Sequence, residues 1–84
     1  MEKLNRKLTM SDPAVFCVNV QGRLGEHWAD YFATQSITAA ADEAGNVVTT
    51  LISEPMDQGA LVGLINRLNT LGIPVISVEC TSTP

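Results

Sequence analysis

The residues best suited to chemistry are few in this chain, and they are far apart. His27 is the only histidine, and Cys17 and Cys80 are the only cysteines. A zinc site needs three or four ligands, and neither a CxxC pair nor a second histidine is present. The sequence also places no nucleophile beside His27 that the imidazole could activate as a general base. We therefore predict no catalytic residue, no metal site and no cofactor, and we interpret both cysteines as inert thiols of a reduced, cytoplasmic protein.

Aromatic residues supply the main alternative, a pocket for a small molecule. Trp28, Tyr31 and Phe32 follow Leu24 at helical spacing, which predicts a short helix that ends near residues 33–35. These side chains would either fill the core beneath the helix or line a pocket between helix and sheet. In the second case the pocket residues would be Arg23, His27, Trp28 and Tyr31.

A longer helix is predicted after Glu54-Pro55. Asp57 is suited to cap its first turn, and Gly72 supplies the left-handed residue that ends it. Gly59 and Gly63, four residues apart, suggest close packing of this helix on a sheet. The apolar stripe of the helix consists of Leu61, Leu64, Ile65 and Leu68.

Four extended runs complete the pattern. They cover residues 15–20, 36–41, 47–53 and 75–80, and a Gly-Asn turn makes the middle two a hairpin. The order βαββαβ predicts an α+β domain of the ferredoxin-like class, with a four-stranded antiparallel sheet and two helices on one face. We expect one domain over residues 13–81, a flexible tail over 1–12 and a second tail over 82–84.

The alternation within these runs predicts which residues share a face of the sheet. We expect Phe16, Val18, Ile76 and Val78 to meet the helices, and Val15, Cys17, Val75 and Ser77 to lie on the opposite face. The hairpin adds either Val47, Thr49 and Leu51 or Val48, Thr50 and Ile52 to that opposite face. Because it would be too apolar for a solvent-facing surface, we predict a homodimer or higher oligomer. Cys17 and Cys80 fall on different faces, so no disulfide is expected between them.

Charge and hydropathy exclude several kinds of partner. Residues 1–11 carry a net charge of +2, whereas the rest of the chain has only Arg23 and Arg67 against eight acids. Such an acidic body cannot neutralise several phosphates, so nucleic acid is excluded as a partner. The sequence contains neither a secretory signal nor an apolar stretch long enough to span a membrane.

The spacing of several residues resembles a group of uncharacterised small bacterial proteins. The shared positions are Gly22, Leu24, Trp28, Phe32, Asp57, Gln58, Leu61, Leu64, Leu71, Gly72, Ser77 and Val78. Members of the group typically have a serine where this chain has Gly25 and a histidine where it has Val62. The resemblance implies the fold and implies no activity.

Three functions remain open at this stage. The first is a non-enzymatic interaction or regulatory module that acts as an oligomer through the apolar sheet face. The second is a small-molecule sensor that uses the pocket described above. The third is a cofactor-free enzyme similar to the dimeric α+β-barrel monooxygenases, which would need an enclosed cavity beside Trp28.

Overall fold

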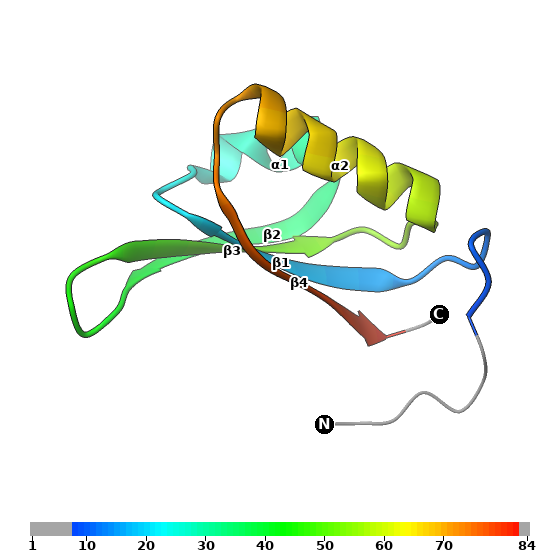
Figure 1. Cartoon of the computed structure of the whole chain (residues 1–84), viewed down its shortest axis with the longest axis horizontal. Coiled ribbons are helices and arrows are strands. Elements are labelled where there is room, and N and C mark those ends of the chain that lie inside the picture. The colour runs from blue at the N-terminus through cyan, green and yellow to red at the C-terminus, as the bar shows by residue number, and fades with distance from the viewer. Residues whose placement is uncertain (1–7, 83–84) are drawn as a thin grey trace.

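The computed structural model describes residues 8–82, and its four strands form a single antiparallel sheet (Figure 1). The order across the sheet is β2-β3-β1-β4, which makes β2 and β4 the edge strands. The predicted α+β class is confirmed. Residues 1–7 and 83–84, which belong to the expected tails, lie outside the described residues. The strands are β1 (Val15–Gln21), β2 (Thr34–Ala41), β3 (Val47–Ser53) and β4 (Val75–Ser82).

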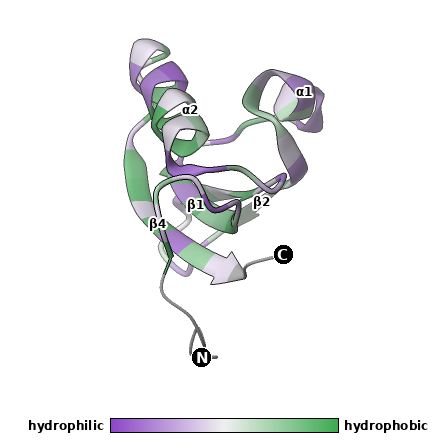
Figure 2. Cartoon of the chain, turned by 90° about the vertical axis from the view of Figure 1, so that its right-hand side faces the viewer, coloured by the Kyte–Doolittle hydropathy of each residue, from purple (hydrophilic) through white to green (hydrophobic). Residues whose placement is uncertain are grey.

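The helices lie on one side of this sheet (Figures 1 and 2). The first helical segment is shorter than predicted, with one 3-10 turn, η1 (Glu26–Trp28), followed by α1 (Ala29–Phe32). It ends because Ala33 adopts a left-handed φ of 53° while its N–H donates to carbonyls of α1. The chain then enters β2 at Thr34, two residues before the predicted start of that strand.

The second helix, α2 (Gln58–Thr70), has the predicted ends. The carboxylate of Asp57 accepts a hydrogen bond of 2.9 Å from the N–H of Ala60. At the other end Gly72 has a φ of 73°, and the N–H of Ile73 donates to the carbonyl of Leu68. This pattern of bonds is the Schellman ending.

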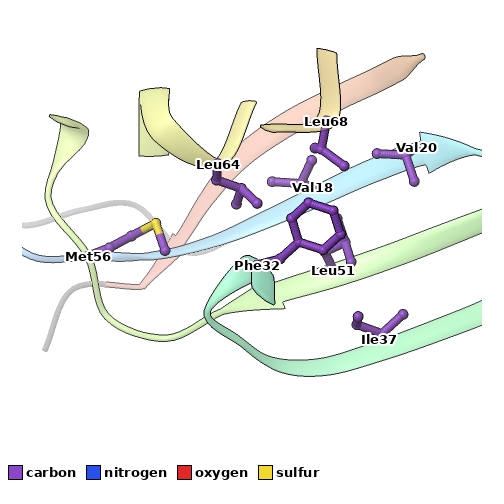
Figure 3. Close-up of a cluster of buried hydrophobic side chains, with 8 residues drawn as sticks. All are labelled: Val18, Val20, Phe32, Ile37, Leu51, Met56, Leu64 and Leu68. Atoms are coloured by element: carbon purple, nitrogen blue, oxygen red, sulfur yellow. The ribbon is translucent and has the colours of Figure 1, made fainter. Parts of the chain in front are cut away.

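The hydrophobic core lies between the helices and the sheet (Figure 3). Both helices, the strands β1, β2 and β3 and the loop before α2 contribute buried side chains to this core. Full burial of one such side chain stabilises the fold by about 1.5–3 kcal/mol. The buried cluster consists of Val18, Val20, Phe32, Ile37, Leu51, Met56, Leu64 and Leu68.

The register of the strands decides which hairpin residues face away from the helices. Cys17 pairs with Ile52, and Asn19 pairs with Thr50. Directly paired residues share a face, so Val48, Thr50 and Ile52 lie on the open face with Cys17. The side chains of Asn19, Thr50 and Ser77 are hydrogen-bonded to each other across three strands of that face, at 2.6 and 3.0 Å.

The prediction that Val75, at the start of β4, lies on the face opposite the helices was wrong. Val75 pairs with Val20, whose side chain is buried under the helices, so Val75 does not share the open face with Cys17. The cause is a shift of register between Asn19 and Val20, which places Ile76 outside the regular pairing. An extra residue in one strand reverses the alternation that a sequence pattern assumes.

Candidate functional site

His27 lies at the surface of η1, where its contacts are packing contacts. Its ring centroid is 5.5 Å from that of Trp28, and its imidazole also covers Gly25, where an added Cβ would lie 2.7 Å from Nδ1. Within residues 8–82, no three His, Cys, Asp or Glu side chains come together in a way that could hold a metal ion.

The aromatic residues of η1 and α1 form a cluster against the core. The centroid of Trp28 lies 5.8 Å from that of Phe32, which is fully buried, and Trp28 itself packs on the core. Tyr31 is half-exposed, and the guanidinium of Arg67 from α2 lies 5.9 Å from the centroid of its ring. This distance is within the range of a cation–π interaction, which therefore links the two helices.

Arg23 lies apart from that cluster. It lines a surface hollow of about 370 Å³ together with Glu26 and Thr38 of the edge strand β2. His27, Trp28 and Tyr31 do not line this hollow. The structure therefore does not gather the four predicted pocket residues around one space.

A second hollow, of about 400 Å³, lies between residues 8–12 and the start of α2, and we call it the α2 hollow. Phe16 of β1 forms part of its wall, with Leu61 and Val62 of α2 opposite the N-terminal segment. This hollow could not be predicted from the sequence, because residues 8–12 show no periodicity and were expected to be a tail. One feature of the sequence indicates an apolar surface at this place: Val62 is an apolar residue of α2 that lies outside its buried stripe.

The two cysteines are free thiols on opposite faces of the sheet, as predicted. Cys17 pairs with Glu79, whereas Cys80 pairs with Phe16 on the helix side. Burial raises the pKa of the Cys17 thiol, and the negative charge of Glu79 raises it further. Cys17 is therefore a weaker nucleophile than an exposed cysteine at neutral pH.

Large apolar side chains are exposed along β4. Val75, Ile76 and Val78 are 37%, 54% and 40% exposed, although Val78 pairs with the fully buried Val18. Figure 2 shows β4 at the edge of the sheet, with hydrophobic segments in green between paler and purple polar ones. The strand carries one charged residue, Glu79, and no proline. Of the predicted interface residues, Val15, Cys17 and Ser77 lie on the open face, and Val75 lies on β4 away from it.

Comparison with protein-family models matches residues 15–79 to a family described as a domain of unknown function (DUF8691). The chain belongs to this family. The match extends from β1 into β4, so it includes the first three strands, the helices of the structure and residues 75–79 of β4. Neither the search of curated proteins nor the search of solved structures returned a match. None of the helices described here is long and apolar enough to cross a membrane.

Proposed function

We propose that this domain is a non-enzymatic interaction module that acts as a homodimer, with β4 as the main contact. The observation that supports this most strongly is the exposure of Val75, Ile76 and Val78 on an edge strand. Soluble monomers usually expose such side chains singly, and a row of them is typical of an interaction site.

The edge itself favours pairing with another strand. A free edge presents unpaired N–H and C=O groups, and natural proteins usually protect it with charged residues, proline or a covering element. Of these protections β4 has one charged residue, Glu79, and no proline. Its pairing with β1 also contains register shifts. An antiparallel β4 from a second copy would pair these groups and continue the sheet across a two-fold axis.

The helix layer supports the same contact. α2 covers Val18 and Val20 of β1, but Val78 on the neighbouring strand stays 40% exposed. A second copy placed beside β4 would bring its own edge residues and helix layer next to Val78, which would complete the burial.

We also propose the ferredoxin-like arrangement for the domain. Each helical connection joins strands that have one other strand between them: β1 to β2 across β3, and β3 to β4 across β1. Two interleaved units of this kind make up the split βαβ fold. The resemblance noted above and the two free thiols favour a bacterial, cytoplasmic protein.

Substitution at the two edges of the sheet tests the contact. We expect Val78→Lys to convert the dimer to a folded monomer, because it places a charge in the proposed interface. Thr38→Lys is the matched control, since Thr38 is exposed on the opposite edge strand, and it should leave the dimer intact. Size-exclusion chromatography with light scattering gives the masses, and circular dichroism checks that each variant folds.

The open face is the alternative contact surface, and the same experiment distinguishes it. That face carries Asn19 and the predicted residues Val15, Cys17 and Ser77. Among its described residues that pair with β1, Glu79 is the one that carries a charge. If two open faces met, Thr50→Lys would break the dimer and Val78→Lys would not. That result would contradict the contact through β4.

A further inference from the structure

We propose that the two copies pair their β4 strands in one register, with Val78 on the two-fold axis, and that Glu79 of each copy accepts a hydrogen bond from Ser77 of the other. This inference rests on the dimer proposed above and adds the residues that decide how the copies align. The three residues are consecutive on an edge strand, so a single register fixes all of these contacts.

The alternation of β4 limits the registers that a two-fold dimer can use. Ser77 and Glu79 lie on the open face. Val78 pairs with the fully buried Val18 and belongs to the helix side. Directly paired residues of antiparallel strands share a face, so each residue must meet one from its own face in the second copy. The axis therefore passes through a residue of the strand, and the candidates in its regularly paired part are residues 77–80.

The apolar side chains favour the axis at Val78. Each Val78 then faces its counterpart, and Ile76 lies next to Cys80 of the second copy, so the helix side of the contact is apolar. An axis at Cys80 would instead place Val78 opposite Ser82 and leave Ile76 without a partner.

The charge of Glu79 excludes the other two registers. An axis at Glu79 would set two carboxylates directly opposite each other, and like charges in that position destabilise a strand pair. An axis at Ser77 would bring Glu79 opposite Val75, which lies on the other face because of the register shift. The ladder between the copies would be interrupted there.

The axis at Val78 also gives Glu79 a hydrogen-bond donor, because each Glu79 then faces Ser77 of the second copy. The Oγ of Ser77 accepts a bond of 3.0 Å from the side-chain amide of Asn19, which accepts one of 2.6 Å from Thr50. A serine hydroxyl accepts and donates at once, and in the described part of the chain Ser77 has no acceptor for its own proton. That proton is available to the carboxylate, and a bond to a charged acceptor is roughly twice as strong as a neutral one.

Single cysteines test the register directly. In a Cys17→Ser, Cys80→Ser background, Val78→Cys places two thiols at the axis. The Cα atoms of directly paired residues lie about 4.5–5.5 Å apart, within the range of a disulfide, so oxidised glutathione should convert this variant to a covalent dimer. Two controls should form the bond at least about tenfold more slowly: Ser77→Cys in the same background, whose Cα atoms would be diagonal neighbours about 7–8 Å apart, and Cys17→Ser alone, which keeps the native Cys80.

A double-mutant cycle tests the bond between Ser77 and Glu79. Ser77→Ala should raise the dissociation constant of the dimer at least about tenfold in the otherwise wild-type chain, because two symmetric bonds to a carboxylate are lost. In a Glu79→Ala background the same substitution should change the constant less than about twofold. Ser36→Ala, at an exposed site on β2, is the matched control and should leave the constant unchanged. Sedimentation equilibrium gives the constants.

The outcomes separate this inference from the dimer itself. Equal crosslinking of Val78→Cys and either control would overturn the register, provided that the reduced protein has the mass of two chains. An equal effect of Ser77→Ala in both backgrounds would overturn the bond to Glu79 and leave the dimer in place. A wild-type protein with the mass of one chain would overturn the dimer and this inference together.

Discussion

Cys17 lies opposite Glu79 on two neighbouring strands, and both burial and that carboxylate raise its pKa. Because alkylation requires the thiolate, we expect Glu79→Gln to lower the pKa of Cys17 and to speed its reaction with iodoacetamide at pH 8. The measurement is the rate against pH in a Cys80→Ser background, with Glu54→Gln as the control for net charge. If Glu79→Gln leaves the dependence of the rate on pH unchanged, the carboxylate does not raise the pKa of Cys17.

Thr49 is a fully buried residue whose hydroxyl holds the loop after β1. Its Oγ1 accepts from the N–H of Leu24 at 3.1 Å and donates to the carbonyl of Gly22. Thr49→Val keeps the shape but leaves both backbone groups without this partner, so it should lower the free energy of unfolding by about 1–3 kcal/mol. Urea denaturation measures the loss, and Thr38→Val, at an exposed site on β2, should change stability by less than about 0.5 kcal/mol.

At the scale of elements, local sequence signals were reliable wherever one residue determines the backbone. Asp57 and Gly72 predicted both ends of α2, because a cap and a left-handed stop each depend on a few neighbouring atoms. The face of Val75 could not be predicted, since the register shift depends on pairing with β1, far away in the sequence. The end of α1 at Phe32 lies next to the predicted residues 33–35, although the left-handed Ala33 that ends the helix is an unusual residue for this conformation.

Gly59 and Gly63 do not pack against the sheet, contrary to the interpretation of their spacing. A Cβ added at Gly63 would meet no atom within 4 Å, and one at Gly59 would meet only the Asp57 carboxylate, at 3.5 Å. Gly63→Ala should therefore raise the free energy of unfolding by about 0.5–1 kcal/mol, because alanine loses less backbone entropy in a helix.

Gly72→Ala is the matched control for that substitution, since both replace a glycine at the same helix. There the φ of 73° is costly for alanine, so stability should fall by about 1–2 kcal/mol. Thermal and urea unfolding show whether each substitution raises or lowers the stability. A loss of stability in Gly63→Ala would mean that neighbouring atoms pack closely against this position.

At the scale of the whole molecule, the sequence predicted that an apolar surface would remain uncovered, and it placed that surface on the open face of the sheet. In the structure the most exposed large apolar residues of the sheet lie on β4. The difference has two physical causes. Asn19, Thr50 and Ser77 satisfy each other's hydrogen bonds and make the open face partly polar, whereas α2 lies over β1 and leaves β4 uncovered. Neither follows from the alternation of residues within single strands.

The mass of the wild-type protein in solution tests the central claim most directly. Sedimentation equilibrium at tens of micromolar should give the mass of two 9.0 kDa chains, and dilution should shift the population toward one chain. In the same experiment Val78→Lys should give a single folded chain. A wild-type protein that stays at the mass of one chain over the whole concentration range would contradict self-association through β4.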